Sequence, residues 1–489
     1  MGTELKEIKP KSIKINFFYN ALLNISNTLL PLITFPYLSR TLGPENNGKI
    51  FFAQAVVSYF VMFGVFGIPT YALREVAKKR DNKENLSKFV QEILLLNIAC
   101  TVVVLIMYII AIPAVPKFRN DYLLFVIFFA NVLFESINVD WFFKGIEEYQ
   151  YITNRSLFFR CVSIILMVVF VRNSNDYIVY AIIYVACISA AYILNLIRLK
   201  KYVIFRKRTL SLAVHLIPMV VFFGTTISNK ISSNIDTIML GFMVGDAEVG
   251  YYNVAIKIKL VLVGLITSLG VVIMPRLSYY MTKNSGADYI RILRKAVSFI
   301  LITAIPLSIY FFIKADASIL FIAGQEYTES ISMMQLIILS VPLISLNCLI
   351  GEQILVVQNQ QNKALISVVA GMAFNVAMNA ALIPYLKGDG ASLATLFTEA
   401  LVLLIQVIFI KDSIATIVKN CGILKIGFAT VLAGICIIMM GKFVHLMPFW
   451  DLLTSAVVFF GIYFILLLIT KETQTLEFIQ MLLAKIKRK

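Results

Sequence analysis

Long apolar runs constrain this sequence more than any other feature. Hydrophobic stretches of roughly 18 residues or more recur from Asn16 to Thr470. Each is long enough to cross about 30 Å of hydrocarbon as an α-helix. Because backbone groups in lipid must satisfy one another, runs of this length favour helices over barrel strands. The sequence therefore predicts an all-α polytopic membrane protein.

Composition shows that this bias covers the whole chain. Hydrophobic residues make up 60% and charged residues 15%, with a mean hydropathy of +0.85, whereas soluble domains are about half apolar and a quarter charged. The first apolar run is too long for a secretory signal and is interpreted as an uncleaved helix. The six cysteines lack CxxC spacing, so neither a metal site nor a disulfide framework is expected.

About fourteen membrane spans are expected. They lie near residues 15–40, 49–73, 86–114, 121–143, 152–171, 177–198, 211–243, 249–275, 295–313, 331–357, 363–386, 389–410, 422–441 and 451–470. Of the 44 Lys and Arg residues, 33 fall in one set of alternate loops and the two termini, and eight fall in the intervening loops. The positive-inside rule then puts both termini in the cytoplasm. The net charge of +17 reflects this loop bias, so no nucleic-acid partner is expected.

The sequence repeats itself at an offset of 202 residues. Ile25–Asn27 recurs as Ile227–Asn229, Gly43 and Gly48 recur as Gly245 and Gly250, and Arg74 recurs as Arg276. Six spans separate the copies, so both copies have the same orientation, as in a parallel repeat about the membrane normal. We expect two six-helix lobes, 1–205 and 206–412, related by a pseudo-twofold axis. Residues 413–489 then add two helices and a basic cytoplasmic tail.

Polar residues form a stripe along the first span. Their spacings of three and four residues place them on one helix face: Asn20, Asn24, Asn27, Pro31 and Thr34. The span 211–243 carries Asn229, Ser233 and Asp236 at the equivalent repeat positions. Such faces either line an aqueous substrate cavity or hold helices together. The charge in the stripe favours the cavity.

Charged residues inside spans indicate a pathway or an ion pair. Asp236 and Lys257 are expected at similar depths, so a structural pair and a functional pair are both open. Lys230 lies deeper and is interpreted as a cationic site for an anionic substrate, with pairing to Glu135 as the alternative. Glu135, Asp236 and Glu399 are candidates to carry a coupling proton or cation. No catalytic motif or metal-ligand spacing occurs, and the chain is expected not to be an enzyme.

Several motifs resemble one family. They are Leu38–Pro44 (LSRTLGP), Phe66–Pro69 (FGIP), Arg74–Ala77 (REVA), Asp140–Gly145 (DWFFKG) and Val249–Tyr252 (VGYY). With these motifs the chain resembles the polysaccharide transporter branch of the multidrug/oligosaccharidyl-lipid/polysaccharide exporter superfamily, and more narrowly the bacterial flippases for O-antigen and capsule repeat units. Relatives often have a basic residue after the aspartate of this seventh span, where this chain has Thr237.

The resemblance implies alternating access in the bacterial inner membrane. The substrate would be an undecaprenyl-diphosphate-linked oligosaccharide, moved from the cytoplasmic to the outer leaflet for O-antigen, capsule or exopolysaccharide synthesis. Cations would bind the diphosphate, namely Arg40, Arg74, Lys230 and Lys257, and the asparagines would bind the sugars. Membrane lipids, a polysaccharide polymerase and a chain-length regulator are the expected partners. No cofactor is expected, and either an H⁺ or Na⁺ gradient or mass action would supply the drive.

Two alternatives share the fold and one does not. A cation-coupled multidrug antiporter would need acidic cavity residues without excess lysine. A peptidoglycan-precursor flippase would need chemistry similar to that of the O-antigen or capsule flippase, and the sequence does not separate these two. An integral-membrane polymerase or acyltransferase would leave the repeat unexplained.

Overall fold

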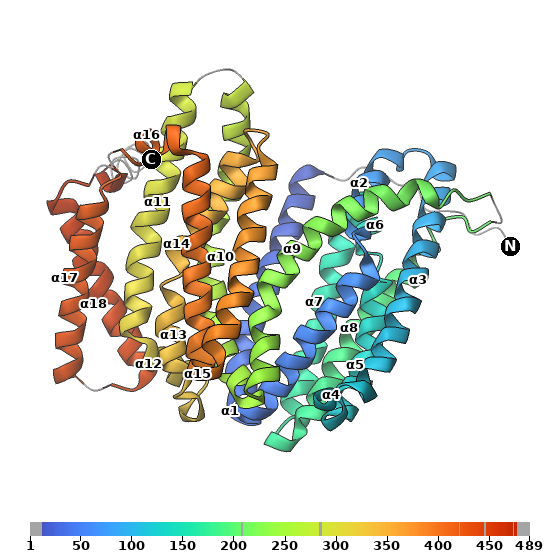
Figure 1. Cartoon of the computed structure of the whole chain (residues 1–489), viewed down its shortest axis with the longest axis horizontal. Helices are drawn as coiled ribbons and strands as arrows, with labels where there is room; N and C mark the ends of the chain where they lie inside the picture. The colour runs from blue at the N-terminus through green and yellow to red at the C-terminus, as the bar shows by residue number, and fades with distance from the viewer. Residues whose placement is uncertain are drawn as a thin grey trace. The chain divides into compact units, whose positions relative to one another are not determined.

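The computed structural model describes residues 12–206, 209–282, 286–419, 421–444, 446–472 and 474–476. Within its helices, the side chains at 13, 28, 29, 32, 225–233, 269–273, 275, 276, 278, 282 and 286 are not described. Throughout the described ranges all regular secondary structure is helical (Figure 1). The prediction of an all-α protein is confirmed.

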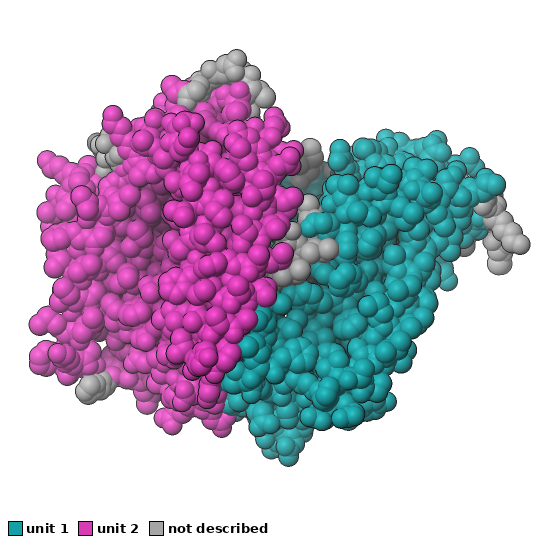
Figure 2. Space-filling view, viewed as in Figure 1, with its two compact units in different colours: residues 1–250 teal, residues 251–489 magenta. Residues whose placement is uncertain are grey.

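The chain divides into two compact units, residues 1–250 and 251–489 (Figure 2). The first unit contains α1 (Ile13–Val65), α2 (Ile68–Lys79), α3 (Lys83–Ala114), α4 (Pro116–Asn120), α5 (Tyr122–Ser136), α6 (Asp140–Gly145), α7 (Tyr149–Phe170), η1 (Ser174–Asp176), α8 (Tyr177–Leu199) and α9 (Ala213–Met243). α10 (Asp246–Thr282) starts in the first unit and continues into the second. The second unit also contains α11 (Gly286–Ile313), α12 (Ala315–Ile322), η2 (Gln325–Tyr327), α13 (Ser330–Ile338), α14 (Val341–Cys348), the π-helical η3 (Leu349–Leu355), α15 (Gln361–Phe409), α16 (Lys411–Val418), α17 (Ile423–Phe443) and α18 (Pro448–Ile469).

In the first unit, α1 is the central helix and packs against α3, α5, α7 and α9. A buried cluster that includes Tyr71, Phe89, Trp141 and Phe143 joins α2, α3 and α6. The side chain of Asn82 accepts hydrogen bonds from the first backbone N–H groups of α3, which satisfies donors that a helix start leaves open.

Two long helices each cover a pair of predicted spans. α1 contains a break at Gly43, where φ is 71°, and α15 contains one at Lys387, where φ is 50°. Ten helices among the described residues are long and apolar enough to cross a membrane, or eleven if the bent pair Ser330–Ile338 and Val341–Leu355 counts as one span. The predicted number, fourteen, is not confirmed and stays a prediction.

Apolar faces remain uncovered by protein. The membrane-span window of α3 has a mean hydropathy of 2.8 with 28% of its residues buried, and that of α18 has 2.7 with 22% buried. Exposed apolar surface of this extent needs a non-aqueous covering. A lipid bilayer supplies it, which agrees with a multi-pass membrane protein.

The last two helices belong to the second unit. α17 and α18 pack on each other and against α11 and α12. Lys314 Nζ lies 2.8 Å from Asp451 Oδ1, and the Tyr463 hydroxyl donates to the Ile302 carbonyl at 2.9 Å. α18 is therefore fixed to the helices before it by polar contacts as well as by packing. The predicted basic tail lies outside the described residues from 477 onward.

The unit boundary differs from the predicted lobe boundary. α9 packs against α1 and α2, so it groups with the first unit although the repeat assigns it to the second lobe. The units divide after Gly250, whereas the repeat divides the chain between residues 205 and 206. The predicted lobes, 1–205 and 206–412, follow the sequence repeat, and this division of the chain stays a prediction.

Candidate functional site

A close backbone crossing connects the two copies of the repeat. A Cβ atom on Gly48 would overlap the carbonyl oxygen of Asp246, and one on Gly250 would overlap that of Pro44. The offset of 202 relates Gly48 to Gly250 and Pro44 to Asp246, so the two contacts are reciprocal. Reciprocity of this kind marks a two-fold relation between surfaces. The predicted repeat therefore has a direct structural counterpart at this crossing.

The turns before the crossing also correspond. Gly43 has φ 71° and its repeat equivalent Gly245 has φ 145°. Both values lie in the region that glycine adopts without a Cβ penalty. Glycine at these positions allows the chain to leave one helix and start the next within a few residues.

Charged side chains surround the crossing. Lys117 Nζ lies 2.8 Å from Asp246 Oδ1, with both side chains less than a fifth exposed, and 4.7 Å from the ring centre of Phe52. Lys49 Nζ lies 3.3 Å from Glu45 Oε1. Positive-inside counting places this end of the unit on the outer side of the membrane.

Asp121 belongs to the same charged group and lies within electrostatic reach of Lys49 and Lys117. Burial raises the pKa of the Asp121 carboxyl above its ordinary value. Lys49 and Lys117 oppose the rise in pKa, while Asp246 and Glu45 add to it. The lysines do not compensate fully, because each also faces another carboxylate.

The predicted asparagine stripe on α1 is exposed in this structure. Asn20, Asn24 and Asn27 all have exposed side chains, whereas Leu23 and Ser26, which lie to one side of the stripe on the same helix, are buried. The asparagines thus lie next to the packed side of α1 rather than within it. The exposed stripe is available to water or to a polar ligand.

The predicted cations lie in several places. Arg40 on α1 and Arg74 on α2 are exposed, and Lys257 on α10 is half-buried in the second unit. The side chains of Asn229, Lys230 and Ser233 lie outside the described residues, so their predicted roles stay predictions. The same holds for the expected pairing of Asp236 with Lys257, since the two residues belong to different units.

Asp236 faces α1 within the first unit. It is 8% exposed and lies close enough to Tyr59 to act on its hydroxyl electrostatically. Two residues earlier on α9, Asn234 Nδ2 donates to Ser58 Oγ at 3.1 Å. Polar contacts therefore connect α9 to α1 at the depth where sequence analysis placed the coupling candidate.

Glu135 belongs to a polar group inside the first unit. Asn131 Nδ2 donates to Glu135 Oε2 at 3.0 Å, and Tyr184 and Tyr192 lie near the carboxylate. From α7, Arg160 Nη1 donates to Ser26 Oγ of α1 at 3.5 Å. Sequence analysis identified Glu135 as a coupling candidate, but it did not identify the tyrosines.

A second buried network is built around Asp140. Arg155 Nη1 donates to Asp140 Oδ1 at 3.0 Å, and Asn195 Nδ2 donates to the same oxygen at 2.6 Å and to Asn138 Oδ1 at 3.0 Å. Sequence analysis missed Arg155 and Asn195 as site residues. Arg155 was counted among the Lys and Arg residues of a cytoplasmic loop, although it lies inside the predicted span 152–171. A charged residue inside a predicted span was the signal that could have identified it.

Glu399 lies in a comparable network of the second unit. Asn347 Nδ2 donates to Glu399 Oε2 at 2.7 Å and to the Glu399 carbonyl at 3.0 Å. Asn379 Nδ2 donates to Asn375 Oδ1 at 3.0 Å. The partner Asn347 was not predicted. In the described part of the chain, no group of three or more His, Cys, Asp or Glu residues could hold a metal ion.

Comparison with protein families gives one match. The model for the family "Polysaccharide biosynthesis protein" matches residues 13–281. A protein of Escherichia coli strain K12 described as an O-antigen transporter is 28% identical over 411 residues, which are 82% of this chain and 97% of that protein. A similarly described protein of Shigella dysenteriae is 23% identical and is covered completely.

Solved structures share the fold. The lipid II flippase MurJ in an inward closed conformation has a TM-score of 0.74 at 15% identity, covering 92% of this chain and 98% of that protein. An inward-facing multidrug resistance MATE transporter of the MOP superfamily has a TM-score of 0.61 at 13% identity, covering 82% and 99%. The fold expected from the motifs is confirmed.

Proposed function

Since this chain belongs to the polysaccharide biosynthesis protein family, we propose that it is a flippase for an undecaprenyl-diphosphate-linked oligosaccharide repeat unit. It moves this substrate from the cytoplasmic to the outer leaflet of a bacterial inner membrane. The surface polymer made from the substrate is an O-antigen, a capsule or an exopolysaccharide. The observation that carries the proposal is the asparagine stripe on α1, whose three side chains are exposed.

The chemistry of that stripe matches a glycolipid. Each asparagine side chain has both donors and acceptors, as sugar hydroxyls require. Exposed amides in a membrane helix are costly against lipid, so the stripe needs a polar surrounding. Arg40 and Arg74, also exposed, and Lys257 supply positive charge for the diphosphate.

Three carboxylates serve energy coupling in this proposal. Glu135, Asp236 and Glu399 each lie among amide or phenol groups rather than at the surface. Binding of H⁺ or Na⁺ at one of them would bias the equilibrium between inward-open and outward-open states. A polysaccharide polymerase and a chain-length regulator would then use the translocated unit.

Lipid analysis of a deletion strain tests the proposal. We expect mass spectrometry to show accumulation of an undecaprenyl-diphosphate oligosaccharide, together with loss of the surface polymer. Expression of the intact chain in the same strain should reverse both effects. Unchanged lipids with new drug sensitivity would contradict the proposal and favour a multidrug antiporter. Accumulation of a peptidoglycan precursor would instead favour the second alternative.

A further inference from the structure

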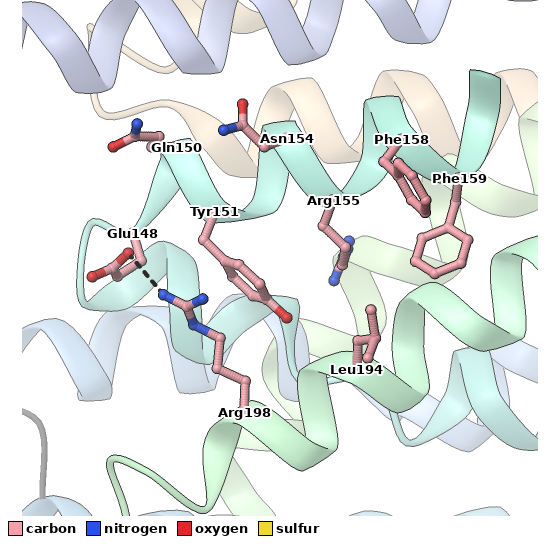
Figure 3. A pocket seen from close by; sticks show the side chains of 9 residues that line it. All are labelled: Glu148, Gln150, Tyr151, Asn154, Arg155, Phe158, Phe159, Leu194 and Arg198. Carbon is pink, nitrogen blue, oxygen red and sulfur yellow. Dashed lines mark ion pairs between the residues drawn. The ribbon is translucent and has the colours of Figure 1, made fainter. Parts of the chain in front are cut away.

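A groove between α7 and α8 has the features of a ligand site that is separate from the asparagine stripe. Its volume is about 450 Å³, within the range of small-molecule pockets. Figure 3 shows the residues that line it, with most of them on one side of α7. They are Glu148, Gln150, Tyr151, Asn154, Arg155, Phe158, Phe159, Leu194 and Arg198.

Hydrogen-bond donors in this groove lack partners. Arg155 Nε, Arg198 Nε and the Tyr151 hydroxyl are buried atoms without a hydrogen-bond partner, and only 5% of the Arg155 side chain is exposed. Leaving a buried donor unpaired costs about 1–3 kcal/mol. Three such donors around one groove indicate that an acceptor-rich group belongs there.

Arg198 supplies the charge that favours an anion. The groove is lined by two guanidinium groups and one carboxylate, but Arg155 is already paired with Asp140. Arg198 Nη2 lies 3.7 Å from Glu148 Oε2, which is too long for a strong hydrogen bond. The Arg198 guanidinium also stacks 3.8 Å above the Tyr151 ring, which fixes its position. A phosphodiester carries one negative charge and has the oxygen acceptors that these donors require.

Further along the groove the lining becomes apolar. Phe158 is 61% exposed and Leu194 is 42% exposed. At 1.5 Å per residue, Phe158 lies about 12 Å from Gln150 along α7. A polar end followed by an apolar wall matches a lipid head group followed by its acyl chain. Both loops at the polar end belong to the set that positive-inside counting places in the cytoplasm.

We propose that this groove binds the phosphodiester head group of a glycerophospholipid from the cytoplasmic leaflet. The phosphate lies between Arg155, Arg198 and the Tyr151 hydroxyl, and an acyl chain follows Phe158 and Leu194. Glu148 lies at the polar end and is placed to accept an ammonium group if the head group carries one. The site goes beyond the proposed flippase activity and does not depend on it.

Native mass spectrometry of the purified full chain tests the site. The probes are dihexanoyl phosphatidylglycerol, dihexanoyl phosphatidylethanolamine and dihexanoyl glycerol, which lacks the phosphate. We expect both phospholipids to bind and dihexanoyl glycerol to bind at least about tenfold more weakly, since a charged hydrogen bond contributes about 1.5–3 kcal/mol. Phosphatidylethanolamine binding more tightly would support the placement of Glu148, and equal binding would support recognition through the phosphate alone.

Variants separate this site from general surface charge. Arg198→Gln should weaken phospholipid binding about tenfold, and Tyr151→Phe should weaken it by a few fold while keeping the ring under Arg198. Lys200→Gln removes the same charge at an exposed position two residues away and should change nothing. Equal weakening in Arg198→Gln and Lys200→Gln would overturn the proposal. Tight binding of dihexanoyl glycerol, or much tighter binding of a polyprenyl diphosphate to this groove, would overturn it as well.

Discussion

The ion pair between Asp140 and Arg155 illustrates how single residues stabilise this protein. The Arg155 side chain is 5% exposed and the Asp140 side chain is 25% exposed. Asn195 donates a further hydrogen bond to the carboxylate, and Asn138 Oδ1 accepts hydrogen bonds from Asn195 and from the Asp140 backbone N–H. A pair of this kind adds little over apolar packing, but breaking it leaves a charge without compensation.

Removal of one partner should therefore be more harmful than removal of both. We expect Arg155→Met to lower the free energy of unfolding by about 2–4 kcal/mol and to reduce abundance in the membrane. Combining it with Asp140→Asn should recover part of that loss, because the uncompensated carboxylate is gone. Thermal unfolding in detergent measures both. Additive effects in the double variant would show that the two groups do not interact.

Asp121 predicts a pH-dependent stability at the outer end. Its pKa is raised mainly by burial, so the folded state disfavours the ionised carboxyl. The resulting loss of stability is absent below the ordinary aspartate pKa of about 3.9. It develops as pH rises from that value to the raised pKa of the folded state and is complete above the raised pKa. Asp121→Asn should unfold at a higher temperature than the natural protein at pH 7, and the difference should disappear near about pH 4. A less stable variant at pH 7 would show that the lysines dominate.

At the scale of helices, the glycine crossing shows what sequence could and could not predict. The offset of 202 and the glycine spacing predicted equivalent turns, and the reciprocal contacts confirm this equivalence. The spacing of the asparagines on α1 also predicted that they share one face, and all three are exposed. Partners such as Arg155, Asn195 and Asn347 were not predictable, because a periodic pattern defines a face but not which neighbouring helix meets it.

Substitution of the crossing glycines tests the role of this contact. Gly48→Ala and Gly250→Ala place a methyl group against backbone atoms, which cannot rotate away. We expect each substitution to reduce the amount of surface polymer at least about tenfold while the amount of protein in the membrane falls little. The added methyl group overpacks the close crossing, which destabilises the conformation that contains it by several kcal/mol. Gly264→Ala is the matched control, since nothing lies within 4 Å of its Cβ position. Normal polymer with Gly48→Ala would show that this close approach is not needed.

At the scale of the whole chain, topology follows from the loops. The uneven distribution of Lys and Arg predicted the sidedness, and the described helices supply the spans, although α1 and α15 each continue across a break. The number of crossings was harder to derive because helix continuity depends on single residues such as Gly43 and Lys387. Hydropathy does not register such local changes of backbone conformation.

Reporter fusions test the predicted orientation. A green fluorescent protein attached after Lys489 should fluoresce, because the C-terminus is predicted in the cytoplasm. Alkaline phosphatase inserted in the turn around Pro116–Asn120 should be active, because that turn is predicted on the outer side. Exchanging the two reporters is the control and should silence both. The opposite pattern would invert the orientation of every span.

The reciprocal contacts at Gly48 and Gly250 also have a consequence for the origin of the chain. A surface that meets its own copy through the same pair of positions is self-complementary. A half-length ancestor with that turn would have formed the crossing as a homodimer, before gene fusion joined the two copies. Fusion also allows the two copies to differ: one carries Asp246 where the other has Pro44, and Lys117 pairs with Asp246.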